Sequence, residues 1–355
     1  MEITFNCENC GQKLKVDYED AGEIFECPAC QGATECPDIP MGPGVTIGDY
    51  FIHEELGRGT MGTVYKAEKK ILKRMVALKI LASHLAWDEE SVARFLREMR
   101  MAAQARHANL VQAYDAGEDN GKYYLAMEFI DGLDLEEHLE AHGAMPEVLA
   151  VRVARGIGKG LGYAWSEHQM IHRDIKPANI MLVDGVTPKI LDLGLAKSTS
   201  DETGLTLTGT IMGTPNYMSP EQVEGSVDLD CRTDIYSLGC TLYHLVTNVV
   251  PFSEQDEQET MQSHASDGSL LDPRGFVPEL STGLFMLLVR MLARDPGKRH
   301  ADWDALDKDL KALIEGKKPR WREDELRDLD SLLPFDARRQ GGSGGGKGFL
   351  GRLFS

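Results

Sequence analysis

The sequence lacks long apolar runs and is poor in basic residues. It has no stretch of about 18 or more apolar residues and no basic-then-apolar order at its N-terminus, so we expect neither a membrane-spanning helix nor secretion. Its 38 Lys and Arg face 57 Asp and Glu, which gives a net charge of −19 at pH 7. Because nucleic acids are bound through clustered Lys and Arg, we expect no nucleic-acid partner. Since neither a spanning helix nor secretion is expected, we expect a cytoplasmic protein.

Cysteines are few, and their placement does not suit a disulfide framework. Of 7 cysteines, four form the pairs Cys7-x-x-Cys10 and Cys27-x-x-Cys30, and Cys36 follows closely. Such pairs are typical of a zinc ribbon, and a segment of about 37 residues is too small to hold a core without a metal. Disulfides or bound iron are the alternatives, with Cys36 as a spare thiol or substitute ligand. We predict structural Zn²⁺ bound by the two pairs.

The composition changes along the chain and predicts several parts. After the ribbon comes a Pro- and Gly-rich linker, then a large folded domain, a charged extension, and a Gly-rich linker with a short amphipathic tail. Their predicted bounds are 1–37, 38–48, 49–315, 316–340 and 341–355. The tail is either frayed or makes weak contact with a membrane surface.

The large domain begins with strand-like runs and continues mainly as helices. We expect strands at Tyr50–Leu56, Thr63–Glu68, Met75–Leu81 and Tyr123–Phe129, with one helical-period segment, Trp87–Ala105, between the third and the fourth. From about residue 134 the pattern becomes mostly helical. The sequence therefore predicts a small β-rich lobe and a larger α-rich lobe.

A glycine-rich stretch lies between the first two expected strands. It consists of Gly57, Arg58, Gly59, Thr60, Met61, Gly62, Thr63 and Val64. Glycines at these spacings allow a hairpin turn to approach phosphates closely. The pattern also opens dinucleotide-binding folds, where it runs into a helix. Here it runs into a strand, which favours a nucleotide-covering hairpin.

The loop from His172 to Asn179 combines three groups that phosphoryl transfer needs. A carboxylate must orient and deprotonate the acceptor hydroxyl, a cation must stand near the γ-phosphate, and an oxygen must bind a divalent ion. Asp174, Lys176 and Asn179 offer these groups. The alternative, that the acidic and amide residues only form a turn, explains less of the pattern.

The ordered series of motifs resembles the eukaryotic-like (Hanks-type) serine/threonine protein kinases of bacteria, over roughly residues 49–315. Its other members are Val76-Ala77-Leu78-Lys79, the Asp-Leu-Gly sequence that starts at Asp192, and Gly213 to Glu221. The resemblance implies an α+β, two-lobed protein-kinase fold. It also implies that ATP binds with Mg²⁺ or Mn²⁺ between the lobes and that proteins with Ser or Thr acceptors are the substrates.

The resemblance also assigns roles to residues. Lys79, oriented by Glu98, would hold the α- and β-phosphates, Asp174 would be the base, and Lys176 would offset developing charge. Asn179 and Asp192 would bind the magnesium ions. The remaining implied contacts to ATP are Leu56, Val64, Ala77, Met127 as gatekeeper, Glu128, Ile130 and Met181.

The segment after Asp192 implies regulation and acceptor choice. Thr214 would help select Ser or Thr acceptors. Hydroxyl residues between Asp192 and Glu221 could receive phosphate that Arg173 would then bind, so we predict autophosphorylation at Thr206, Thr208 or Thr210, through a dimer if it occurs in trans. The alternative is that hydroxyl residues simply suit a loop. A pseudokinase or zinc-ribbon scaffold that acts by protein binding is the competing function, but Lys79 and the other key positions are retained.

Overall fold

The computed structural model describes most of the chain and divides it into two compact units. The described residues are 2–17, 24–35, 42–59, 62–82, 92–93, 95–96, 99, 103–191, 215–252, 257–265, 270 and 272–319. The first unit comprises Met1–Phe95 and Tyr114–Phe129, and the second comprises Leu96–Ala113 and Ile130–Ser355. Among the described residues, no helix combines the length and apolar character required to cross a bilayer.

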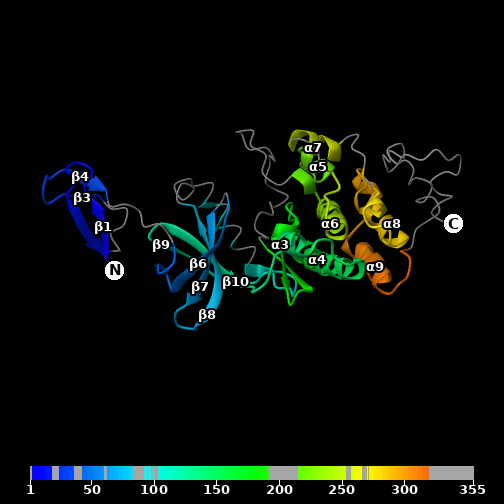
Figure 1. The fold of residues 1–355 in the computed structure, drawn as a ribbon, viewed down its shortest axis with the longest axis horizontal. Coiled ribbons are helices and arrows are strands. Elements are labelled where there is room, and N and C mark those ends of the chain that lie inside the picture. The colour runs from blue at the N-terminus through cyan, green and yellow to red at the C-terminus, as the bar shows by residue number, and fades with distance from the viewer. Residues whose placement is uncertain are drawn as a thin grey trace. The chain divides into compact units, whose positions relative to one another are not determined.

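The N-terminal ribbon is built from two small antiparallel hairpins of the same plan (Figure 1). The first pairs β1 (Glu2–Asn6) with β2 (Lys13–Asp17), and the second pairs β3 (Ile24–Glu26) with β4 (Ala33–Glu35). A Cys-x-x-Cys turn connects the strands in each hairpin. Among the described residues of this part, the buried apolar core consists of Phe5 and Leu14 besides two cysteines, which is too little apolar area to hold a fold of this size alone.

A six-stranded antiparallel sheet forms the rest of the first unit, with strand order β5-β6-β7-β8-β10-β9. The strands are β5 (Thr46–Ile47), β6 (Tyr50–Gly59), β7 (Gly62–Lys69), β8 (Arg74–Leu81), β9 (Ala113–Asp119) and β10 (Lys122–Glu128). Alternating side chains of β6, β7 and β8 supply a core that includes Tyr50, Ile52, Tyr65 and Leu78. The four expected strands are therefore present, joined by two that the sequence analysis missed.

The expected helix Trp87–Ala105 is described only in part. Residues 92–93, 95–96, 99 and 103–104 have helical backbone, and Phe95 and Met99 are buried. Glu98, the predicted partner of Lys79, lies outside the described residues.

The second unit is mainly helical (Figure 1). Its long helices are α3 (Leu135–His142), α4 (Glu147–His168), α6 (Cys231–Thr247), α7 (Glu257–Ala265), α8 (Thr282–Met291) and α9 (Trp303–Ile314). The shorter elements are η2 (Pro177–Asn179), β11 (Ile180–Val183), β12 (Thr187–Ile190), η4 (Pro215–Tyr217), α5 (Pro220–Val223), η5 (Pro273–Gly275) and η6 (Pro296–Lys298). One continuous apolar core joins α4, α6 and α8.

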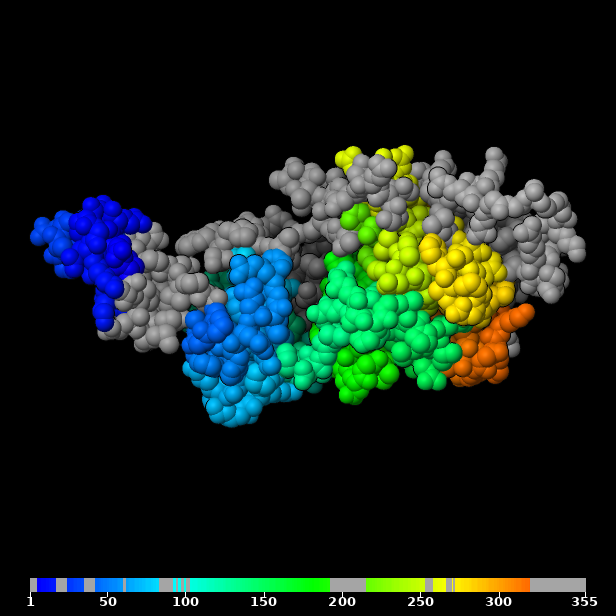
Figure 2. Space-filling view, in the orientation of Figure 1, coloured from blue at the N-terminus to red at the C-terminus, as the bar shows by residue number. Residues whose placement is uncertain are grey.

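Small residues on α4 explain how closely α9 approaches it. The Trp303 ring at the start of α9 lies against Gly158 and Gly162, where an added Cβ would stand 3.6 and 3.4 Å from its nearest ring atoms. Arg155 then pairs with Asp307 at 2.7 Å. In Figure 2 the surfaces of α4 (green), α8 (yellow) and α9 (orange) are continuous on the face shown.

Candidate active site

The catalytic loop brings the three predicted residues of its motif together. Lys176 Nζ lies 3.1 Å from Asp174 Oδ2, and Asn179 Nδ2 donates to the same carboxylate oxygen at 2.9 Å and to the Asp174 carbonyl at 2.8 Å. Asn179 therefore uses its amide nitrogen inside the loop, which leaves its Oδ1 as the atom that suits a divalent cation. The side chains of Asp174 and Lys176 are each 21% exposed, so both remain partly accessible from solvent.

Asp234 on α6 fixes the strained turn before the catalytic carboxylate. Its two oxygens accept hydrogen bonds from the backbone N–H groups of His172 and Arg173 at 2.7 and 2.8 Å. Arg173 has φ 66°, a conformation that costs energy for any residue except glycine. Burial raises the pKa of Asp234, while these hydrogen bonds and the nearby cations oppose that rise. Asp234 thus anchors the loop from α6 through two backbone hydrogen bonds.

His172 connects the catalytic loop to the residue that precedes Asp192. Its Nε2 lies 2.9 Å from the Leu191 carbonyl, and its Nδ1 accepts the Asp174 N–H at 3.3 Å. The Leu191 N–H donates to the Asn179 carbonyl at 2.9 Å. Both bonds hold Leu191, the last described residue before the Asp-Leu-Gly motif, beside the catalytic loop.

Gln222 is a positioning residue that the sequence analysis missed. Its Nε2 donates at 2.8 Å to the carbonyl of Arg173, immediately before Asp174. Gln222 also completes a capping box with Ser219 at the start of α5. The pattern Ser-x-x-Gln is a recognised helix-start signal, so the helix could have been found, whereas the contact to the catalytic loop could not.

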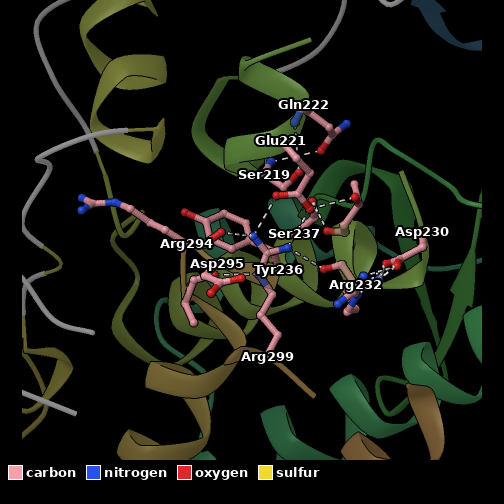
Figure 3. A network of polar contacts seen from close by, with 12 residues as sticks. Ser219, Glu221, Gln222, Asp230, Arg232, Tyr236, Ser237, Arg294, Asp295 and Arg299 are labelled. Carbon is pink, nitrogen blue, oxygen red and sulfur yellow. Dashed lines mark hydrogen bonds and ion pairs between the residues drawn. The ribbon is translucent and has the colours of Figure 1, made fainter. Parts of the chain in front are cut away.

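Below that helix, Glu221 and Arg299 form a buried ion pair (Figure 3). Arg299 Nη1 and Nη2 lie 2.7 and 2.8 Å from the two carboxylate oxygens. Thr233 donates to the same carboxylate at 2.8 Å. Burial raises the pKa of Glu221, but the Arg299 cation outweighs this and lowers it. The pair anchors α5 and does not touch the reacting groups.

In the first unit, strand register brings the predicted ATP-binding residues into neighbouring positions. Val64 lies opposite both Gly57 and Lys79, and Ala77 lies opposite Met127. Lys79 is only 8% exposed. The other described members of this set are Arg58 and Gly59 on β6, Thr63 on β7, and Glu128 at the end of β10.

Two glycine-loop positions have a structural explanation. Gly62 has φ 156°, and a Cβ there would stand 2.0 Å from the Ile80 carbonyl oxygen. Only glycine allows that close backbone approach. Leu56 lies in a register shift of the β6–β7 pairing and is 46% exposed, as a bulge allows.

In the second unit, Ile130 is buried and Met181 lies on β11, bridged to Asp134. Several predicted site residues lie outside the described residues: Thr60, Met61, Glu98, Asp192, Thr206, Thr208, Thr210 and Thr214. Their roles remain predictions.

The four paired cysteines gather into one cluster. Their sulfur atoms lie within 4.8 Å of one another, with Cys7 Sγ 3.8 Å from Cys30 Sγ and Cys10 Sγ 3.7 Å from Cys27 Sγ. A tetrahedral Zn²⁺ ion with bonds of about 2.3 Å requires sulfur atoms about 3.8 Å apart. The donor set and its spacing therefore fit zinc.

Matching turns hold the two cysteine pairs. In the first, the Cys7 N–H donates to the Gln12 carbonyl and the Gly11 N–H to the Cys7 carbonyl; in the second, Cys27 donates to Gly32 and Gln31 to Cys27. Burial raises the pKa of the Cys7 thiol, but hydrogen bonds from the backbone of Cys10 and Asn9 and from neighbouring thiols lower it to about 6. The Gln12 backbone lowers the pKa of the Cys10 thiol, but contacts with the neighbouring thiols and burial raise it to about 12. The cluster alone thus favours the charged form at Cys7 and opposes it at Cys10, and a divalent cation would stabilise the additional thiolates.

Comparison with known proteins agrees with this geometry. The protein kinase domain family matches residues 50–310. A probable serine/threonine-protein kinase of Clostridium acetobutylicum is 36% identical over 251 residues, and the serine/threonine-protein kinase PrkC of Bacillus subtilis is 32% identical over 291 residues. These alignments cover 71% and 81% of this chain and 38% and 44% of those proteins.

Among solved structures, the PknI kinase domain of Mycobacterium tuberculosis matches with a TM-score of 0.58 and 27% identity, covering 76% of this chain and 100% of that one. The fold is that of a protein kinase domain. The chain belongs to the protein kinase family, and the predicted α+β kinase fold is confirmed. It spans about two-fifths of the length of the curated relatives it matches.

Proposed function

We propose that this chain is a serine/threonine protein kinase that transfers the γ-phosphate of ATP to hydroxyl groups of proteins. The observation that carries the proposal is the shared contact of Lys176 and Asn179 with the Asp174 carboxylate, at 3.1 and 2.9 Å. The family membership and the names of the curated relatives, all serine/threonine-protein kinases, support it.

Each residue would contribute a separate part of the reaction. The Gly57–Gly62 loop and Lys79 would hold the phosphates, while Asn179 and Asp192 would bind magnesium, which supplies charge neutralisation of the β- and γ-phosphates. Asp174 would orient the acceptor hydroxyl and take its proton. Lys176, beside it, would offset the charge that develops on the transferred group. Lys176 at this position also supports Ser or Thr over Tyr acceptors.

The test is phosphate transfer by the full chain. Purified protein is incubated with radiolabelled Mg-ATP and myelin basic protein, and the products are hydrolysed to identify phosphoamino acids. We expect phosphoserine or phosphothreonine that depends on the divalent ion. Mass spectrometry of the same reaction shows whether Thr206, Thr208 or Thr210 has been phosphorylated. A chain that binds ATP but transfers no phosphate would support the pseudokinase alternative instead.

We propose further that the cysteine cluster binds structural Zn²⁺ and that the ribbon is a protein-interaction module. The sulfur spacing supports the metal, and the acidic character of the ribbon argues against nucleic acid. Use of ATP and the six cysteines outside disulfides among the described residues support a cytoplasmic location. Metal analysis of the purified chain tests the zinc assignment.

A further inference from the structure

Two histidines contact the segment that connects the predicted acceptor-selecting residue to α5. This segment is η4, Pro215–Tyr217, and it contacts both α6 and α7. The hydroxyl of Tyr217 lies 2.8 Å from Nδ1 of His244 on α6, and the two ring centroids are 6.2 Å apart. Tyr217 is only 7% exposed. One end of η4 is therefore fixed to α6 through an imidazole.

The second histidine, His264, lies at the end of α7 and is completely buried. Its Nδ1 is 2.8 Å from the hydroxyl of Tyr236, and its ring packs edge-on against Phe252 with centroids 4.6 Å apart. The Tyr236 ring lies 4.8 Å from the guanidinium carbon of Arg299, the partner of Glu221. Figure 3 shows Tyr236 beside this ion pair. Through Tyr236, His264 thus connects α7 to the Glu221–Arg299 ion pair that anchors α5.

Both imidazoles are neutral near pH 7. Burial lowers the pKa of His264 to about 4, with Arg294 adding to the effect and the backbone of Asn216 opposing it. Burial also lowers the pKa of His244. A neutral imidazole has one acceptor nitrogen, so each histidine can accept the O–H of its tyrosine. A side chain that cannot accept would leave a buried hydroxyl unsatisfied.

The segment held in this way adjoins the reacting groups. Helix α5 begins at Pro220, three residues after Tyr217, and its Gln222 donates to the carbonyl of Arg173 at 2.8 Å, immediately before Asp174. A shift of η4 would therefore displace α5 and, through Gln222, the backbone just before Asp174, where an acceptor hydroxyl must bind. Nucleotide phosphates, by contrast, depend on residues of the glycine loop and β8.

We propose that His244 and His264 are positioning residues that set the affinity of the kinase for its protein acceptor, by holding Tyr217 and Tyr236. The inference rests on the proposed kinase function. It differs from a general packing role because it predicts a selective effect on the acceptor. It also predicts that a neutral side chain with an acceptor atom near the position of Nδ1, such as asparagine, replaces histidine.

The test compares His244→Leu and His264→Leu with His244→Asn and His264→Asn, using the full chain, Mg-ATP and myelin basic protein. We expect each leucine variant to raise the KM for the acceptor about tenfold. This factor corresponds to the loss of one hydrogen bond worth about 1.4 kcal/mol. The KM for ATP should stay unchanged, and the asparagine variants should recover most of the loss. His53→Leu, on β6, is the matched control. Thermal unfolding is measured for every variant.

The outcomes separate the two proposals. If the wild type transfers no phosphate, the kinase function fails. If it does transfer phosphate, an unchanged acceptor KM in the leucine variants overturns the inference. Equal rises in the KM for ATP and in the KM for the acceptor overturn it as well. So do asparagine variants that are as impaired as the leucine variants. If His264→Leu fails to fold, the comparison of His244→Leu with His244→Asn, at a half-buried position, decides whether the inference holds.

Discussion

The guanidinium of Arg299 faces the carboxylate of Glu221 end-on, with its two Nη atoms 2.7 and 2.8 Å from the two carboxylate oxygens. The Arg299 side chain is fully buried and that of Glu221 is 12% exposed. Three further bonds from the same group go to carbonyls: Nε donates to Ala293, Nη1 also donates to Arg232, and Nη2 also donates to Arg294. One side chain therefore connects α5, α6 and the segment between α8 and η6, which supports the acceptor side of the catalytic loop.

Arg299→Met should therefore destabilise the second unit strongly. Removing one partner of a buried pair leaves an uncompensated charge and costs about 3–5 kcal/mol. The free energy of unfolding from urea titration measures the loss. Lys317→Met is the control, because Lys317 pairs with Glu315 at the surface with its side chain 70% exposed, where a pair is worth about 0–1 kcal/mol. Similar losses in both variants would contradict the anchoring role.

Gly62→Ala should impair the glycine loop, whereas Gly57→Ala should fold normally. A Cβ at Gly62 would meet the Ile80 carbonyl at 2.0 Å, while Gly57 has nothing within 4 Å. We expect Gly62→Ala to destabilise the protein by about 2 kcal/mol or more. Thermal unfolding without nucleotide measures the stability of each variant. The shift in unfolding temperature on adding Mg-ATP measures how far the glycine loop of each variant is impaired. Equal stability of the two variants would show that the β7–β8 approach is looser than described.

The cysteine cluster should hold one Zn²⁺ ion per chain. Cys27→Ser should lower the bound zinc, measured by mass spectrometry of the purified protein, and should reduce protease resistance of the ribbon, since the metal supplies its folding energy. Cys240→Ala is the control because Cys240 is buried in α6 and is not one of the four clustered cysteines. Zinc content unaffected by Cys27→Ser would disprove the ligand set.

Acid should destabilise the second unit through His264. Its folded pKa is about 4, below the ordinary 6.5, so the unfolded chain binds a proton between these values and the folded chain does not. Stability should therefore fall as the pH drops from about 6.5 to about 4 and level off below. The full loss is on the order of 3 kcal/mol.

The measurement is urea unfolding at pH 7.5 and pH 5 for the wild type and His264→Asn. The groups that face His264 are Tyr236, Phe252, Arg294 and the Asn216 backbone, and they are the same in both proteins. The variant should lose less stability on acidification than the wild type. An identical pH dependence would show that His264 is not the titrating group.

Sequence reasoning found the motifs but not every element. Periodicity and composition predicted four strands of the first-unit sheet, yet β9 was missed, although the Asn120-Gly121 turn, with φ of 49° and 71°, marks its hairpin with β10. Asp184-Gly185 likewise marks the β11–β12 turn. These local signals could have been used.

Other features depend on contacts between distant residues. The chain gives no local reason for Asp234 to bind the backbone of His172, 62 positions away, or for His264 to bind Tyr236, 28 positions away. Only the packing of α6 against its neighbours brings them together. The catalytic loop was predictable because its three groups lie within six residues, whereas the residues that hold it in place come from several helices.

The central claim is that Asp174 acts as the base, and comparing two aspartate-to-asparagine changes tests it most directly. Asp174→Asn removes the proton acceptor, while Asp184→Asn makes the same change at an exposed turn ten positions on. The rate of phosphate transfer to myelin basic protein should fall about a hundredfold or more in Asp174→Asn and stay at the wild-type level in Asp184→Asn. Near-normal transfer by Asp174→Asn would contradict the account.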